Sequence, residues 1–354
     1  MTGPALDTLL SQVLVAYTIE LDNEWERQLL ESKRPRIFLL SFMMWANYLR
    51  LIPTAGIPAG GLEELAQHKV DLNGLTRWRY ATVEPPEGMP KAPRREWIVC
   101  PTDDGLFACD LWEPLPALIE SRWRERYGAT VIEDLEIALQ SLIDRFDHRP
   151  TPLYLPDVTS RDEMFTLSPP ATGTGLPNPG PLFALLSRVL LELTLDFEAG
   201  SSVALPIAAN TLRVSGPEPT PIRDLPERAG VSKEGTAQAL TVLARHDLVA
   251  VEPIRNGRGK QALLTPRGLA AQSGYHDRLD LVETQWRARY GGEPVNRLAK
   301  TLMALVGDSN ILANSPLAEA MEPPPGVWRA SPPPPRSLPF HPMVIGRGGW
   351  PDAS

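Results

Sequence analysis

Two distant segments of the chain carry apolar residues in the same helical pattern. From Leu6, and again from Leu182, apolar side chains recur at steps of +3, +4, +7, +8 and +11. This spacing places them on one face of a helix, so each segment predicts an amphipathic helix that buries a single stripe. The letters agree as well, since residues 9–22 read LLSQVLVAYTIELD and residues 185–198 read LLSRVLLELTLDFE.

Three further pairs of similar segments follow in the same order along the chain. Residues 77–85 (RWRYATVEP) resemble 245–253 (RHDLVAVEP), residues 118–128 (LIESRWRERYG) resemble 281–291 (LVETQWRARYG), and residues 149–158 more weakly resemble 335–345. Four matches in one order indicate an internal duplication. Trp123 and Trp286 recur at one position of this repeat, and we expect both to pack in the core rather than to form a ligand cage.

The repeat sets the expected domain organisation. The first half comprises residues 1–158, a linker rich in proline and glycine comprises 159–181, and the second half comprises 182–308. Residues 309–335 contain runs of proline, so we expect an extended and mobile insertion. Residues 336–354 are either an extended segment that lies on the body, as their counterpart in the first half suggests, or a disordered tail.

The second half contains a helix, a turn, a second helix and a hairpin at about residues 218–268. Residues 221–229 predict the first helix, Gly230 a turn with positive φ, and Ser232 the N-cap of a helix over 233–246. The residues of that helix expected to face the core are Ala237, Leu240, Val242 and Leu243. Strands at 247–251 and 261–265 follow, and Pro266 begins the next helix. This order is that of a winged helix-turn-helix, whose second helix enters the major groove of DNA.

Over residues 221–291 the chain resembles the MarR family of bacterial transcription regulators, and the resemblance is carried by GVSKEGTAQALTVLARHDLVAVEPIRNGRGKQALLTPRG at 230–268. It implies binding of double-stranded DNA, and dimerisation through N- and C-terminal helices around two winged domains. It also implies that a small-molecule effector binds in a cleft between the helical body and a winged domain, and shifts the spacing between the two winged domains.

The duplication and the resemblance together define the expected fold class. It is mostly α with small β-hairpins (α+β), with two tandem winged helix-turn-helix domains on a shared helical body and a pseudo-two-fold axis. Helices around residues 5–30 and 182–200 are expected to pack with helices around 111–145 and 275–306. One chain would then form an intramolecular pseudo-dimer, and further homodimerisation stays open.

The turn of the second hairpin collects positive charge in an acidic chain. The net charge is −8, yet residues 254–267 carry four cations and no acid. In the family the tip of the wing enters the minor groove, where arginine is favoured, and this implies that role for Arg255 and Arg258. On the second helix, the candidates for phosphate contacts are Ser232 and Lys233, and those for base edges are Thr236 and Gln238. The expected DNA-binding residues are therefore Ser232, Lys233, Thr236, Gln238, Arg255, Arg258 and Lys260.

The corresponding region of the first half, about residues 53–110, is degenerate. If residues 62–66 match 222–226, 12 positions separate Leu65 from Arg77, against 20 from Leu225 to Arg245. Eight residues are then missing where the second helix should be. The hairpin turn of the first half is five residues longer than that of the second half. Its candidate phosphate contacts are Lys91, Arg94 and Arg95.

The composition and the motifs of the chain exclude several classes of protein. The 354 residues are 43% hydrophobic and 22% charged, which is typical of globular domains. The two cysteines rule out a disulfide framework, no signal peptide is visible, and the apolar stretch at 37–49 is too short for a membrane span, so we expect a buried helix there. None of the five histidines has metal-binding spacing, and neither a nucleophile elbow nor a P-loop occurs.

We therefore expect no enzyme activity, no catalytic or metal-binding residues and no cofactor. The sequence favours a DNA-binding transcription regulator that is cytoplasmic and associates with the nucleoid when bound to DNA. The alternative is a winged-helix scaffold that acts as a protein-binding or small-molecule-sensing module with little DNA affinity. The net charge of −8 and the shortened helix of the first half favour this alternative, whereas the intact second hairpin disfavours it.

Overall fold

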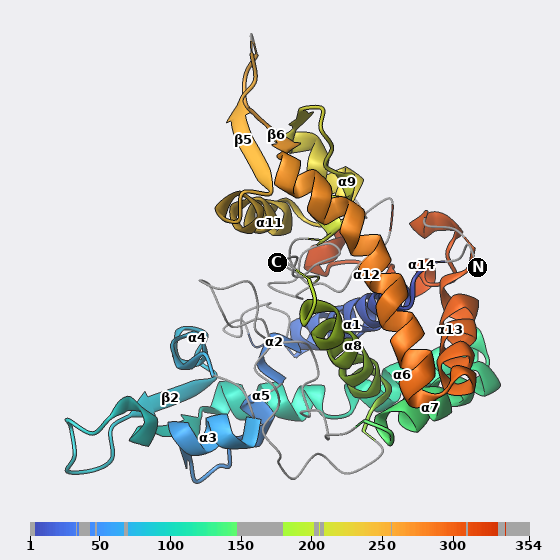
Figure 1. Ribbon diagram of the computed structural model, residues 1–354. Coiled ribbons are helices and arrows are strands. Elements are labelled where there is room, and N and C mark those ends of the chain that lie inside the picture. Colours follow the sequence, from blue (N-terminus) through green and yellow to red (C-terminus); the bar gives the residue numbers. More distant parts are fainter. Residues whose placement is uncertain are drawn as a thin grey trace.

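Over the residues that the structure describes, the protein is mostly helical with two small antiparallel sheets of three strands each, which confirms the expected α+β class (Figure 1). The computed structural model describes residues 4–32, 34, 43–46, 48–66, 70–146, 180–201, 205, 209–255, 257–308, 311–331 and 337. Most of the expected linker, the fourth pair of similar segments and all of the expected C-terminal segment except Ser337 lie outside these residues. No helix in the described ranges combines the length and the apolar character that a membrane span requires.

The helices of the chain vary widely in length. They are α1 (Leu6–Glu31), α2 (Met43–Ala46), α3 (Ala59–Ala66), α4 (Leu72–Arg77), α5 (Asp103–Trp112), α6 (Leu115–Tyr127), α7 (Ala129–Ile143), α8 (Leu182–Glu198), α9 (Asn210–Val214), α10 (Leu225–Ala229), α11 (Lys233–Arg245), α12 (Pro266–Tyr290), α13 (Gly292–Val306) and α14 (Ala318–Met321). Short 3-10 helices include η1 (Leu49–Leu51), η2 (Arg94–Glu96), η5 (Leu312–Asn314) and η6 (Trp328–Ala330).

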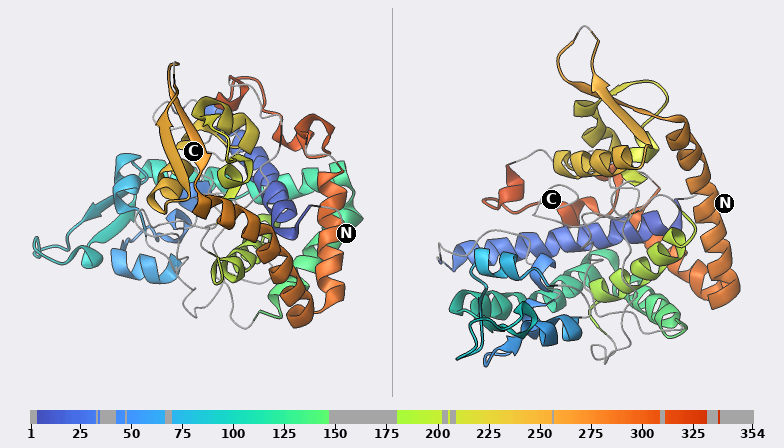
Figure 2. Two further views of the ribbon diagram at one scale, coloured as in Figure 1. Left: turned by 45° about the horizontal axis from the view of Figure 1, so that its top comes forward. Right: turned by 60° about the vertical axis from the view of Figure 1, so that its left-hand side comes forward.

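The long helices form a central body. Helix α1 packs against α8, α6 and α13, while α8 also contacts α7 and α12, and α7 packs against α13. This is the packing expected between the helices of the two halves. Two sheet units project from the body at separate places (Figure 2). The first sheet unit comprises β1 (Ile57–Pro58), α3, α4, β2 (Ala81–Glu84) and β3 (Ile98–Pro101), and the second comprises β4 (Thr220–Pro221), α10, α11, β5 (Val249–Pro253) and β6 (Lys260–Leu264).

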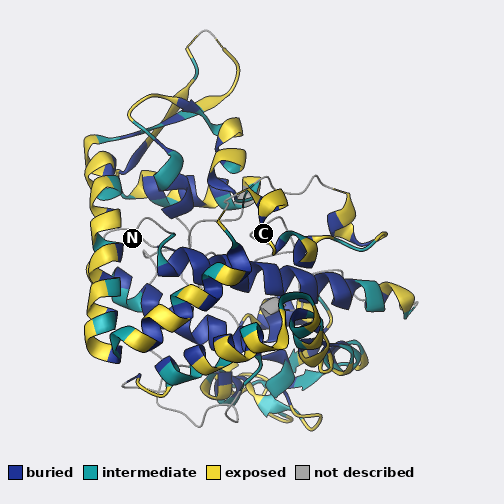
Figure 3. Cartoon of the chain, turned by 90° about the vertical axis from the view of Figure 1, so that its right-hand side faces the viewer, coloured by how far each residue is buried: buried dark blue, intermediate teal, exposed yellow. Residues whose placement is uncertain are grey.

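Helix α1 is buried on every side, which corrects the expected single apolar stripe. Every residue from Leu6 to Glu26 is buried, including several carboxylates and amides (Figure 3). In α8 the run from Leu182 to Thr194 is likewise buried throughout. The polar positions of both helices are covered because other helices and the segment 311–331 pack around them.

Carboxylates link the two halves reciprocally at the beginnings of α1 and α8. Glu120 of α6 accepts a hydrogen bond at 2.7 Å from the backbone N–H of Leu182, the first residue of α8. Glu283 of α12 accepts one at 2.7 Å from the N–H of Leu6, the first residue of α1. An anionic side chain is favourable at a helix N-terminus, where backbone N–H groups lack helical partners. Each half thus supplies the acceptor that completes the first helix of the other.

The repeated tryptophans lie in the core, as predicted. The side chains of Trp123 and Trp286 are fully buried, and each packs edge-on against the tyrosine four residues later. The indole Nε1 of Trp123 donates to Glu20 at 2.7 Å, and that of Trp286 donates to Asp196 at 2.8 Å. Buried indole N–H groups require such acceptors, so the carboxylates of α1 and α8 fix the ring positions.

The strand register corrects the predicted correspondence between the first helices of the two units. Their strand orders are β1-β3-β2 and β4-β6-β5, with Pro58 opposite Ile98 and Pro221 opposite Gln261. Leu62 and Leu225, each four residues after its proline, are both fully buried. Leu62 therefore corresponds to Leu225, and not to the residue at 222.

The second helix of the first unit is short, as the missing residues predicted. Helix α4 has 6 residues and α11 has 13, a difference of seven (13 − 6) rather than the predicted eight. Both begin in the same way, because Asp71 accepts a hydrogen bond from the N–H of Gly74 and Ser232 accepts one from Gly235. The shortening therefore removes the C-terminal part of the helix and keeps its start.

The helices that follow the two sheets, α5 and α12, begin in the same way, with a threonine cap and a closely packed glycine. Thr102 and Thr265 cap α5 and α12 by accepting from the N–H of Gly105 and Gly268. A Cβ atom on either glycine would overlap a backbone carbonyl oxygen, that of Tyr80 for Gly105 and that of Leu248 for Gly268. Close approach of helix and strand requires glycine at both places.

This contact leads to a prediction for two glycines of α12. Gly268→Ala is expected to lower the free energy of unfolding by about 2 kcal/mol or more, because a methyl group must displace backbone. Gly274→Ala is expected to raise it by about 0.4–1 kcal/mol, since nothing lies within 4 Å of the added Cβ and alanine is the better helix former. Urea unfolding followed by circular dichroism measures both, and equal effects would contradict the contact at Leu248.

The segment after α13 is folded onto the body, which corrects the expected extended and mobile insertion. Within 311–331, η5, α14 and η6 follow one another, and α14 packs on α1. The residues of this segment that are buried include Leu312, Leu317, Ala320, Met321, Val327 and Arg329. Arg329 lies 3.5 Å from Asp22 in an ion pair whose side chains are 3% and 2% exposed. Apolar residues, most of them before the first proline run at 323–325, supply the contacts that an extended chain would lack.

The apolar stretch at 37–49 is not one helix where the structure describes it. Helix α2 ends at Ala46, and Leu49 begins the 3-10 helix η1. Trp45, Tyr48 and Leu49 are buried, as expected of a core segment. Residues 35–42 lie outside the described part of the chain.

Candidate nucleic-acid interface

The turn between α10 and α11 has the geometry predicted from its sequence. Gly230 adopts φ 70° and ψ 28° at the end of α10, a left-handed conformation that glycine adopts readily. Ser232 then has extended backbone, and its hydroxyl accepts from the N–H of Gly235 at 2.9 Å. Both predictions are confirmed, and together they fix the angle at which α11 leaves the turn.

The prediction for the core face of α11 is confirmed at Leu240 and Leu243 and wrong at its N-terminal end. Thr236 is 1% exposed, and its hydroxyl donates to the carbonyl oxygen of Ser232 at 2.9 Å. Ala237, expected in the core, is exposed, and Val242 is only half-buried. The prediction that Thr236 points outward to base edges is therefore wrong. A threonine can be buried here because a backbone carbonyl of the preceding turn accepts a hydrogen bond from its hydroxyl group.

The exposed face of α11 carries polar residues along the length of the helix, together with Ala237 and Ala244. Gln238 and Lys233 are exposed, as the prediction required, and Ser232 is half-buried at the N-terminal end. Sequence reasoning missed two residues on this face, Thr241 and Arg245, which are exposed. The N-cap at Ser232 and the buried pair Leu240 and Leu243 would have identified them, because these fix which side of the helix faces outward.

The hairpin of the second unit presents its cations at the tip. Strands β5 and β6 pair in a regular antiparallel register from Val249 opposite Leu264 to Pro253 opposite Lys260. Strand β5 begins two residues later than the predicted strand at 247–251, and β6 begins one residue earlier than the predicted strand at 261–265. Arg255, Arg258 and Lys260 are exposed, and their side chains have neither hydrogen bonds nor ion pairs to the part of the chain that the structure describes. These cations are available to an external anion.

The three candidate cations in the hairpin turn of the first unit, Lys91, Arg94 and Arg95, are arranged differently. The guanidinium of Arg94 donates to the side-chain oxygen of Asn73 in α4 and lies 5.9 Å from the ring centroid of Trp97. Arg95 lies 3.6 Å from Glu64, an ion pair whose side chains are 70% and 76% exposed. Lys91 is exposed in the turn. Two of the three candidate phosphate contacts, Arg94 and Arg95, are therefore engaged with side chains of their own unit.

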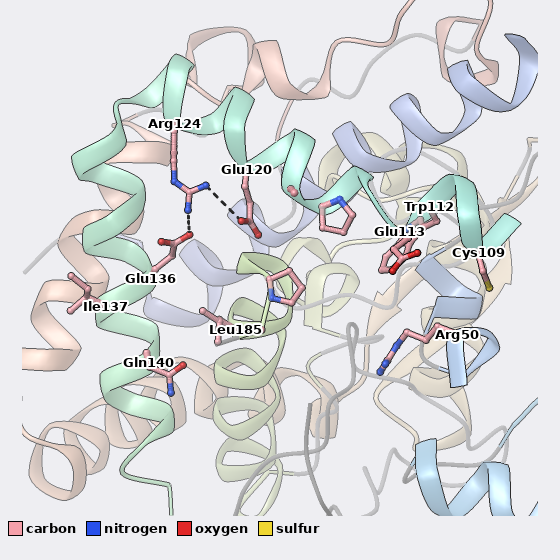
Figure 4. A pocket seen from close by; sticks show the side chains of 14 residues that line it. Arg50, Cys109, Trp112, Glu113, Glu120, Arg124, Glu136, Ile137, Gln140 and Leu185 are labelled. Carbon is pink, nitrogen blue, oxygen red and sulfur yellow. Dashed lines mark hydrogen bonds and ion pairs between the residues drawn. The ribbon is translucent and has the colours of Figure 1, made fainter. Parts of the chain in front are cut away.

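A cavity of about 840 Å³ lies among the helices of the body (Figure 4). Its walls come from α5, α6 and α7 and from the start of α8, and Arg50 of η1 reaches it from the side of the sheet unit. Trp112 and Leu185 contribute apolar surface. Neither sheet unit lines this cavity, so it does not test the expected cleft between the body and a winged domain, and binding of an effector stays a prediction.

Arg124 organises the charged end of this cavity. Its guanidinium lies 2.5 Å from Glu136 and 3.7 Å from Glu120, and Figure 4 shows it directed toward both carboxylates. Burial raises the pKa of Glu120, although the backbone N–H of Leu182 and the charge of Arg124 oppose the shift. Burial also raises the pKa of the Cys109 thiol to about 12, so this cysteine is a poor nucleophile.

Among the described residues, no group of three or more histidine, cysteine, aspartate and glutamate side chains is placed to hold a metal ion. Comparison of the chain with protein-family models, with curated protein sequences and with solved structures found no match.

Proposed function

We propose that the chain binds double-stranded DNA as a transcription regulator of the MarR type, through a winged helix-turn-helix formed by the second sheet unit. The observation that carries the proposal is the exposed cationic tip of the β5–β6 hairpin beside the exposed polar face of α11. The net charge of the chain is −8, and this tip supplies the local cationic surface that binding to duplex DNA requires.

In the proposed complex, each element of the second unit has a separate role. Helix α11 lies in the major groove, where Gln238 can make paired hydrogen bonds to an adenine. Ser232 and Lys233 hold phosphates at the start of the helix. Arg255 and Arg258 enter the adjacent minor groove, and Lys260 contacts the backbone beside it. The bound protein then blocks or recruits RNA polymerase.

We also propose that the chain is a tandem duplication with a pseudo-two-fold axis through the body. Support comes from the equal strand orders, the shared capping residues of α5 and α12, and the reciprocal contacts of Glu120 and Glu283. A body assembled from both halves positions the second unit without a partner chain.

A salt titration tests the DNA-binding proposal. Fluorescence anisotropy with a labelled random duplex should give a log–log dependence of affinity on salt with a slope of about −3 to −4, because Lys233, Arg255, Arg258 and Lys260 each neutralise about one phosphate. Absence of duplex binding at low salt, or affinity independent of salt, would contradict the proposal and favour the scaffold alternative.

A second role, small-molecule sensing, is favoured by the cavity beside Arg124. Apolar walls with a few convergent polar groups are typical of sites for small organic ligands. Because Glu120 both lines this cavity and accepts from the first N–H of α8, a ligand that displaced its carboxylate would alter the junction between the two halves. Its expected effect is a change in the affinity measured by the same titration.

A further inference from the structure

The two sheet units differ most in the elements that would meet DNA. At about 1.5 Å per residue, α11 is about 20 Å long and α4 about 9 Å. The DNA major groove is about 12 Å wide. Helix α11 makes more than three turns and exposes polar side chains on each of them, whereas α4 makes fewer than two turns. Only α11 is long enough to present side chains to several successive base pairs.

The exposed side chains of α4 are also engaged within the first unit. Asn73 accepts a hydrogen bond from Arg94, and the guanidinium of Arg77 lies 5.2 Å from the ring centroid of Trp78. Base readout by Asn73 would require its hydrogen bond to Arg94 to break. The hydroxyl of Thr76 donates to Leu72, as that of Thr241 in α11 donates to Ala237, so the two helices differ chiefly in that the amide of Asn73 is engaged whereas that of Gln238 is not engaged with any described residue.

The charges of the two hairpins also favour DNA binding by the second unit over the first. The turn of the first unit carries Glu87 and Glu96 together with its three cations. The turn of the second unit carries Arg255 and Arg258, with Lys260 at the start of β6, and contains no acid. The first hairpin therefore attracts a phosphate backbone much less strongly than the second.

The surface that a partner chain would otherwise cover is occupied within the chain. Helices α1 and α8 pack together, and the first N–H group of each bonds to a carboxylate from the other half. A second chain is not needed to complete the body.

From these differences we infer that one chain recognises a single, asymmetric DNA half-site, read by α11 alone, and that the first sheet unit reads no bases. This inference rests on the proposed function and specifies its DNA target. A regulator with two equivalent reading helices binds an inverted repeat, because the symmetry of the site mirrors that of the protein. A chain with one reading helix selects a sequence without two-fold symmetry.

Selection of duplexes from a random-sequence pool by the full chain tests the inference. The expected result is one contiguous motif without an inverted repeat, and sedimentation of the selected duplex with the protein should show one chain per duplex. Enrichment of an inverted repeat with centres about 10 base pairs apart, or two chains per site, would overturn the inference.

A matched pair of double variants assigns the reading helix. Gln238→Ala with Thr241→Ala should reduce the preference for the selected motif over random duplex by about tenfold or more. Asn73→Ala with Thr76→Ala should leave both the motif and the preference unchanged, and a changed motif would show that the first unit reads bases. Duplex binding without any enriched motif would refute half-site reading but not DNA binding, whereas absence of all duplex binding would refute the proposed function itself.

Discussion

Replacement of both Arg255 and Arg258 by alanine is expected to weaken binding to a random duplex by roughly ten- to a hundredfold at physiological salt. Each guanidinium is exposed and without a side-chain partner among the described residues, so it binds phosphate or minor-groove atoms without first breaking an internal contact. A guanidinium and a phosphate in contact at an exposed surface attract each other by about 1 kcal/mol, so the loss of two such contacts corresponds to roughly ten- to a hundredfold in affinity. The slope of log affinity against log salt should also become shallower by about 2, since about 0.9 is lost per phosphate contact.

The matched control is Arg94→Ala with Arg95→Ala, which removes the same charge from the other hairpin. Because Arg94 bonds to Asn73 and Arg95 pairs with Glu64, the expected loss of affinity is less than about threefold. Circular dichroism should show that both double variants stay folded. Equal losses from the two pairs would mean that the chain uses its two hairpins equivalently on DNA.

Local signals in the sequence predicted local structure well. The positive φ of Gly230, the cap at Ser232 and the start of α12 at Pro266 all occur as expected. Each depends on the conformational limits of one residue or on a hydrogen bond within three residues. Such features are fixed by neighbours along the chain, so they can be predicted without knowledge of the fold.

The orientation of α11 was harder to predict because residue type was a poor guide to burial. Alanine at 237 suggested the core and threonine at 236 suggested the surface, yet the reverse holds. The hydroxyl of Thr236 bonds within its own helix, so its burial costs little. Thr236 is therefore no longer a candidate for base contacts, whereas Gln238 is exposed as predicted.

Burial of polar residues on α1 could not be predicted from periodicity, because their partners come from distant parts of the chain. Glu20 receives hydrogen bonds from Trp123 and Arg126 of α6. Glu26 accepts from the backbone N–H of Trp328 at 2.5 Å. A polar residue with a distant partner has the same sequence signature as one exposed to water, so the pattern predicted a solvated face.

The ion pair between Asp22 and Arg329 is expected to anchor the segment 311–331. Arg329→Met should lower the free energy of unfolding by about 3–5 kcal/mol, because it leaves Asp22 buried without its cation. The control is Arg297→Met, whose guanidinium lies 2.7 Å from Glu293 on the surface with side chains 47% and 69% exposed. Its expected loss is about 0–0.5 kcal/mol. Urea unfolding monitored by circular dichroism compares the two.

A third variant separates loss of the pair from loss of packing. Asp22→Asn combined with Arg329→Met removes both charges of the pair, and it should destabilise the protein less than Arg329→Met alone because residue 22 then carries no buried charge that needs Arg329. If the double variant is at least as unstable as Arg329→Met, the contribution of the charge pair is refuted. If Arg329→Met behaves like Arg297→Met, the ion pair does not anchor segment 311–331, and its buried apolar side chains alone hold it on α1.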